Sequence, residues 1–147
     1  MKILVDADAC PVRDIIVSEA KAFNIPVIMV TDTSHIIDEK GFKVITVDKS
    51  FDSADFVIAN MAQKGDISVT QDYGLATLLI SKGVYTVNQN GFIYTNENID
   101  RMLFERHISK EQRRKKHRFK GGMKKRTKED DEKFRKCFVE LLERLCK

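Results

Sequence analysis

Residues 2–12 read Lys2-Ile3-Leu4-Val5-Asp6-Ala7-Asp8-Ala9-Cys10-Pro11-Val12, a short apolar run followed by two acids and a proline. The apolar run is typical of a buried strand, and Pro11 suits the first turn of a helix. Apolar residues then recur near the 3.6-residue period, which predicts a helix over 12–23. A strand that leads directly into a helix is the repeating unit of a parallel α/β sheet.

The same unit recurs along the chain. Short apolar runs predict further strands at 27–31, 43–47, 66–70 and 84–87, and amphipathic spacing predicts helices from Asp52 or Ser53 to Lys64 and over 72–82. This alternation implies right-handed crossovers and a mainly parallel sheet in a three-layer α/β/α fold. Residues 32–42 fit either a turn of helix or a small hairpin.

The chain divides by composition into three parts. Residues 1–106 form the expected α/β domain, and 107–128 form a basic segment. Within the first part, a turn at 88–91 precedes a helix expected to turn Ile99, Leu103 and Ile108 inward. Residues 129–147 regain amphipathic spacing, which predicts a last helix that docks on the domain.

Net charge is distributed unevenly along the sequence. Residues 101–128 hold 13 Lys or Arg against two acids, whereas the rest of the chain has an acidic excess. Basic segments of this kind bind polyanions, so we expect a nucleic-acid partner, RNA more than DNA. Arg113, Arg114, Lys115 and Lys116 are the candidate phosphate contacts, and a solvated linker is the alternative.

Other classes of protein fit the sequence poorly. The longest apolar runs are too short to span a membrane, and Asp6 interrupts the only stretch that resembles a signal peptide, so we expect a cytoplasmic protein. Three cysteines without C-x-x-C spacing favour neither a disulfide framework nor structural zinc. Cys10 lies among acids that disfavour its thiolate, so we expect a small buried residue there.

Carboxylates mark the candidate site. Asp6 and Asp8 follow the first strand, Asp72 follows the fourth, and Asp52 and Asp55 begin the middle helix. Carboxyl ends of parallel strands converge on one crevice, where acids repel each other unless a cation lies between them. Helix capping is an adequate explanation for Asp52 alone. It explains the set poorly, so the sequence favours a shared divalent cation or an aspartyl nucleophile.

Several blocks carry a resemblance to a known family. Val5-Asp6-Ala7-Asp8-Ala9-Cys10-Pro11-Val12 and Gly65-Asp66-Ile67-Ser68-Val69-Thr70-Gln71-Asp72-Tyr73-Gly74-Leu75-Ala76, with residues 50–55 and 91–100, resemble the YaiI/YqxD family, also called UPF0178 or DUF188. The resemblance covers Met1 to about Arg106. The order of the acids is also similar to that of PIN-like nuclease domains.

The resemblance implies a PIN-like fold and a metal-dependent nuclease. In that case Asp6, Asp55 and Asp72 hold one or two Mg²⁺ or Mn²⁺ ions, supported by Asp8 and Asp52, and Thr70 or Gln71 positions water or phosphate. Many PIN-like sites have a glutamate where this chain has Asp55.

Two other functions fit parts of the sequence. Asp6-Ala7-Asp8 after a strand also resembles the first motif of haloacid dehalogenase-type phosphatases, with Asp6 as nucleophile and Thr31 as a phosphate ligand. However, Gly65-Asp66 precedes a strand, whereas the fourth motif of those enzymes follows one. The third possibility is an RNA-binding protein whose acids hold a structural cation without turnover.

Overall fold

A six-stranded sheet forms the centre of the protein. The computed structural model describes residues 1–8, 10–32, 42–48, 53–116 and 125–146, of which 112–116 are described by their backbone alone. Five strands are parallel, and the sixth is antiparallel to its neighbour. Their order across the sheet is β3 (Lys43–Val47), β2 (Val27–Asp32), β1 (Ile3–Asp6), β4 (Ile67–Val69), β5 (Tyr85–Asn88) and β6 (Phe92–Ile93).

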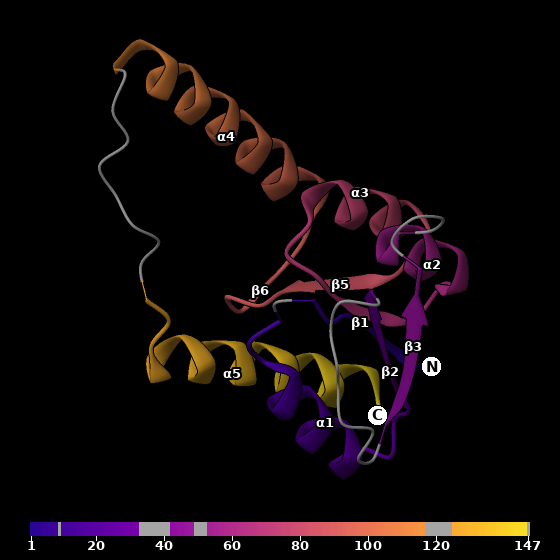
Figure 1. Ribbon diagram of the computed structural model, residues 1–147. Coiled ribbons are helices and arrows are strands. Elements are labelled where there is room, and N and C mark those ends of the chain that lie inside the picture. Colours follow the sequence, from indigo (N-terminus) through magenta and orange to yellow (C-terminus); the bar gives the residue numbers. More distant parts are fainter. Residues whose placement is uncertain (9, 33–41, 49–52, 117–124, 147) are drawn as a thin grey trace.

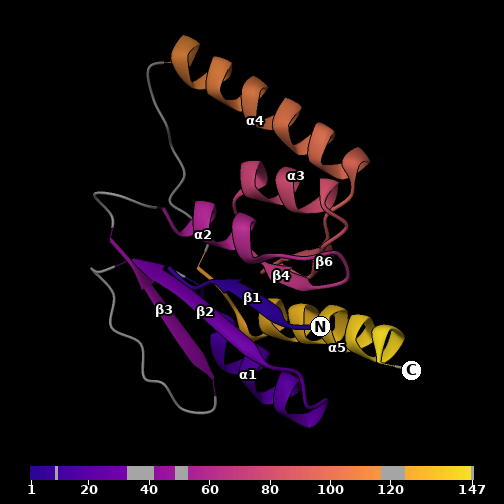
Figure 2. The same ribbon diagram turned by 90° about the vertical axis from the view of Figure 1, so that its right-hand side faces the viewer.

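Helices cover both faces of the sheet, which confirms the predicted three-layer α/β/α architecture. Helices α1 (Arg13–Ala22) and α5 (Lys128–Leu145) lie on one face, and α2 (Ala54–Met61) and α3 (Tyr73–Ser81) lie on the other (Figures 1 and 2). Helix α4 (Asn96–Lys116) packs beside α3, and its second half extends away from the sheet (Figure 2). No helix within the described ranges is long and apolar enough to cross a membrane.

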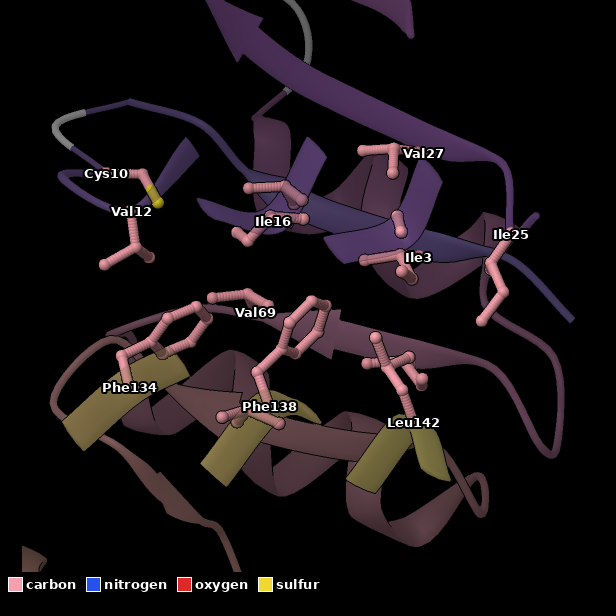
Figure 3. Packing of buried hydrophobic residues seen from close by; sticks show 14 of the residues in the cluster. Ile3, Cys10, Val12, Ile16, Ile25, Val27, Val69, Phe134, Phe138 and Leu142 are labelled. Atoms are coloured by element: carbon pink, nitrogen blue, oxygen red, sulfur yellow. The ribbon is translucent and has the colours of Figure 1, made fainter. Parts of the chain in front are cut away.

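Helix α5 completes the larger of the two main cores. Its rings of Phe134 and Phe138 stack with centroids 5.3 Å apart and pack toward Ile3, Ile16 and Val69 (Figure 3). Burial of this apolar face holds the helix on the sheet. A capping box begins the helix: the Thr127 side chain accepts from the Asp130 backbone N–H, and the Asp130 side chain accepts from the Thr127 backbone N–H. The C-terminal helix is therefore an integral layer of the fold.

Some sequence predictions were wrong. Leu103 and Ile108 are exposed, because α4 packs on the body through Ile99, which is buried, and Met102. The boundary predicted at residue 106, between the α/β domain and the basic segment, falls within α4 and stays a prediction. Strand β6 was not predicted, because two residues are too few to show a period. Residues 33–41, where the sequence allowed a helical turn or a hairpin, lie outside the described residues.

Asp66 lies at the opposite end of the sheet from the candidate site, just before β4. Its carboxylate accepts hydrogen bonds from the Lys2 backbone N–H (3.1 Å) and the Gln63 backbone N–H (2.9 Å), and it forms an ion pair with Lys2 Nζ (2.6 Å). Burial opposes its charge, but these bonds hold the pKa of Asp66 below its ordinary value. The residue ties the N-terminus to the loop before β4.

We therefore expect Asp66→Asn to lower the free energy of unfolding by about 2 kcal/mol at neutral pH. A carboxylate with a depressed pKa stabilises the fold above its unfolded pKa, and this stabilisation is lost as the pH falls through the lower, folded pKa. Urea denaturation at neutral and acidic pH measures the difference. An equal effect of the substitution at both pH values would contradict the assignment.

Candidate active site

The candidate site lies where the strand order reverses. Strand β1 has β2 on one side and β4 on the other, and both pairs are parallel. The chain therefore leaves β1 and β4 toward opposite faces, which opens a crevice beyond their carboxyl ends. Asp6 is the last residue of β1, and Thr70, Gln71 and Asp72 directly follow β4. The fold thus places two of the predicted acids at the carboxyl edge of the sheet.

Thr70 links these two acids. Its buried hydroxyl donates to Asp6 Oδ2 (3.0 Å) and accepts from the backbone N–H of Asp72 (3.0 Å). The Thr70 carbonyl accepts from Tyr94 Oη (3.1 Å), which in turn accepts from Asn88 Nδ2 (2.7 Å). This chain of buried hydrogen bonds fixes the turn between β4 and α3.

Asp72 begins α3. Its Oδ1 accepts from the backbone N–H groups of Gly74 (2.8 Å) and Leu75 (3.2 Å), so it is the N-cap of that helix. The cap uses one carboxylate oxygen. Its role as a cap therefore does not exclude Asp72 from the candidate site.

Asp55 is the second residue of α2, which packs beside α3 on the same face of the sheet. Ser53 caps that helix by accepting from the Phe56 backbone N–H (3.2 Å), so the cap does not occupy the Asp55 side chain. Instead, Asp55 interacts with Asp72, and burial together with this interaction raises the pKa of Asp55.

The electrostatics identify these acids as one cluster. The pKa of Asp6 is raised to about 6, mainly by burial and also by the charges of Asp8 and Asp72, while the hydrogen bond from Thr70 acts in the opposite direction. Burial, the hydrogen bond to Asp72 and the charges of Asp72 and Asp6 raise the pKa of Asp55 to about 7. Burial opposes the charge of Asp72, but bonds from Asp55 and the α3 amides keep its pKa below the ordinary value.

Asp8 lies on the other side of Asp6, against β2. Its carboxylate accepts from Thr31 Oγ1 (2.5 Å) and from the backbone N–H of Asp32 (3.3 Å to the nearer oxygen). Its charge acts on Asp6. Asp8 is therefore bound to β2 and acts on the cluster through its charge on Asp6.

The chemistry of the cluster fits a hard divalent cation. Its donors are carboxylate oxygens, which Mg²⁺ and Mn²⁺ prefer. Within the described residues, no three Asp, Glu, His or Cys side chains are already arranged around a position for an ion. Asp52, the fifth predicted ligand, lies outside the described residues.

The remaining predicted residues differ in their placement. Gln71 is exposed beside the cluster, and Arg113, Arg114, Lys115 and Lys116 belong to the last turns of α4, where only the backbone is described. Cys10 is buried in the larger core, and burial raises the pKa of its thiol, as expected for a structural residue. Sequence reasoning missed Tyr94, Asn88 and Arg106. A Tyr just after a strand and an Asn at the end of one give no distinctive signal in the sequence, and Arg106 lies at a predicted boundary.

The fold and site define an α/β protein with a carboxylate cluster at the switch point of a parallel sheet. The DUF188 family model, described as "Uncharacterized BCR, YaiI/YqxD family", matches residues 4–144. The chain belongs to this family. The match reaches residue 144 in α5, whereas the motifs that carry the resemblance end at about Arg106.

Curated relatives agree with this assignment. The chain is 55% identical over 139 residues to a UPF0178 protein of Ruminiclostridium cellulolyticum, covering 95% of this chain and 90% of the relative. It is 46% identical over 143 residues to one of Alkaliphilus oremlandii, covering 97% and 92%. A UPF0178 protein of Clostridium acetobutylicum is 46% identical over 146 residues, covering 98% of each chain. No solved structure gave a significant match.

Proposed function

We propose that the protein is a divalent-metal-dependent nuclease that hydrolyses phosphodiester bonds in RNA or DNA. The observation that carries this proposal is the meeting of Asp6, Asp55 and Asp72, from β1, α2 and the start of α3, at the switch point of the sheet. The order of these acids along the chain, which is similar to that of PIN-like nucleases, supports it.

In this proposal the three acids hold Mg²⁺ or Mn²⁺. When bound, the cation supplies a polarised water and neutralises charge on the phosphodiester. Asp6 and Asp55 must release their protons to act as ligands, and their raised pKa values mean that this occurs near neutral pH. Thr70 orients Asp6 through its hydroxyl, and the α3 amides orient Asp72. Asp8 and Asp52 are assigned supporting roles.

Two observations favour the nuclease over a haloacid dehalogenase-type phosphatase. The Thr31 hydroxyl is buried and donates to Asp8, so it is not directed at a substrate phosphate. Asp66, the acid of the only Gly-Asp pair, is ion-paired with Lys2 at the other end of β4. The phosphatase reaction needs both groups beside Asp6.

The test compares cleavage of labelled single-stranded RNA and DNA with hydrolysis of p-nitrophenyl phosphate. We expect wild type to cleave nucleic acid with Mn²⁺ or Mg²⁺ and to lose this activity in EDTA. Cleavage that persists in EDTA would contradict the proposal. Turnover of p-nitrophenyl phosphate through a trapped aspartyl-phosphate at Asp6 would favour the phosphatase instead. Binding of RNA without any turnover would favour a non-catalytic RNA-binding protein.

A further inference from the structure

A cleft opens between the start of α3 and the first half of α4. Its volume is about 340 Å³, and the residues that line it are Gln71, Tyr73, Met102, Glu105, Arg106 and Ser109. A volume of this order accommodates one small organic ligand. The lining combines an aromatic ring, a guanidinium group and hydrogen-bonding side chains.

The cleft borders the carboxylate cluster. Gln71 and Tyr73 directly precede and follow Asp72 in the chain, and the positive charge of Arg106 helps to lower the pKa of Asp72. Tyr73 is held in place by an edge contact with the ring of buried Tyr94, with centroids 6.1 Å apart and an interplanar angle of 69°. Tyr94 is the residue that bonds the Thr70 carbonyl. Tyr94 therefore contacts both Tyr73 in the lining of the cleft and Thr70 beside the acids.

A second hollow continues along α4. It has a volume of about 480 Å³ and is lined by Leu103, Arg106, His107 and Lys110. Arg106 belongs to both hollows, so a basic track leads from Tyr73 to Lys110. Helix α4 then continues to Lys116 through the most basic part of the sequence.

We infer that the cleft binds an unpaired nucleotide next to the cleaved phosphodiester, with Tyr73 stacking on the base and Arg106 contacting the backbone phosphate. This inference rests on the proposed nuclease function for the position of the cleaved bond. A stacked base needs an uncovered face, which a base inside a duplex does not offer. Glu105 accepts hydrogen bonds, which base amino groups and ribose hydroxyls donate. The substrate class is accordingly single-stranded nucleic acid running along α4.

The stacking by Tyr73 and the phosphate contact of Arg106 should have different effects on binding of labelled oligouridylate and oligothymidylate. Fluorescence anisotropy in EDTA measures this binding without cleavage. Tyr73→Ala and Tyr73→Leu should weaken binding about tenfold, because a base loses its stacking partner. Their affinities should keep the wild-type salt dependence. Tyr73→Phe retains the ring and should bind as wild type. Arg106→Gln should weaken binding and reduce the slope of log K against log salt by about 0.7, as expected for one lost phosphate contact on a single strand.

An abasic chain of the same length tests the stacking directly. Wild type should bind it about tenfold more weakly than oligothymidylate, and Tyr73→Ala should bind the two equally. Arg101→Gln is the matched charge control, because Arg101 is exposed on α4 and lines neither hollow. Thermal unfolding of each variant separates a folding defect from a binding defect.

The outcomes separate this inference from the nuclease proposal. If wild type cleaves nucleic acid but the Tyr73 and Arg106 variants bind and cleave as wild type does, the subsite is wrong and the nuclease proposal stands. If wild type never cleaves but these variants lose binding as described, the subsite is supported and the nuclease proposal fails. Equal affinity of wild type for duplex and single strand, or self-association through α4 with no nucleic-acid binding, would overturn the subsite.

Discussion

Replacing Asp6 with asparagine is expected to lower the rate of Mn²⁺-dependent phosphodiester cleavage by at least about 100-fold. Loss of residues that only orient metal ligands costs about 10- to 100-fold in metal affinity or activity, so loss of a ligand should cost more. Asp6 is the last residue of β1. The charges of Asp8 and Asp72 act on it, and its own charge acts on Asp55. Asparagine preserves its shape and its ability to accept the Thr70 hydrogen bond, so the substitution removes mainly the charge.

Initial rates on a labelled single-stranded substrate, measured over a range of Mn²⁺ concentrations, quantify the loss. Asp14→Asn is a suitable control, because Asp14 is an exposed acid in the first turn of α1 and should leave the rate unchanged. Asp72→Asn should behave like Asp6→Asn, since asparagine still caps α3. Full activity in both the Asp6 and the Asp72 variants would show that the cluster does not carry the reaction.

The same Asp6→Asn substitution is expected to stabilise the metal-free protein by up to about 3 kcal/mol above pH 6. Burial raises the pKa of Asp6 from an ordinary 3.8 to about 6, so the folded state disfavours the charged carboxylate. This cost is absent below the unfolded pKa, grows as the pH rises from about 4 to 6, and is constant above that. A neutral side chain avoids it.

Denaturant unfolding in EDTA at pH 4 and pH 8 measures this effect. The variant should be more stable than wild type at pH 8 and nearly equal to it at pH 4, whereas Asp14→Asn should match wild type at both. Added Mn²⁺ should stabilise wild type and reduce the difference. Lower stability of the Asp6 variant at pH 8 would mean that Asp6 is a structural residue and that its charge is compensated within the protein.

The parallel part of the fold could be predicted because each strand is an apolar run between turn residues. Lys43–Val47 was assigned with its observed bounds, and α1, α2 and α3 differ from their predicted ranges by a few residues at most at each end. The inward-facing residues of α4 could not be predicted, because helical spacing of apolar residues does not show whether another element packs against them. Its Leu103 and Ile108 have helical spacing, yet both are exposed. Strand β6 is defined by its pairing with β5. Two residues are too few to show that pairing in the sequence.

The candidate site could be predicted as far as its acids. Asp6 and Asp72 follow strands, and parallel strands bring their carboxyl ends together. The pairing of Asp55 with Asp72 required the packing of α2 against α3, which no local pattern contains. Tyr94 bonds to Thr70 across 24 residues of sequence, and Asn88 bonds to Tyr94 across six. No local sequence pattern shows these hydrogen bonds, so they could not be predicted. Arg106 likewise reaches the site because α4 packs on α3.

The central claim is that the carboxylate cluster at the β1–β4 switch point binds the divalent cation that the reaction needs. Isothermal titration of the EDTA-stripped protein with Mn²⁺ at neutral pH tests it most directly. The account predicts saturable binding that releases protons, as seen from heats that vary with the ionisation enthalpy of the buffer, and binding should be strongly weakened in Asp6→Asn and Asp72→Asn. Absence of Mn²⁺ binding to wild type, or undiminished binding to both variants, would contradict it.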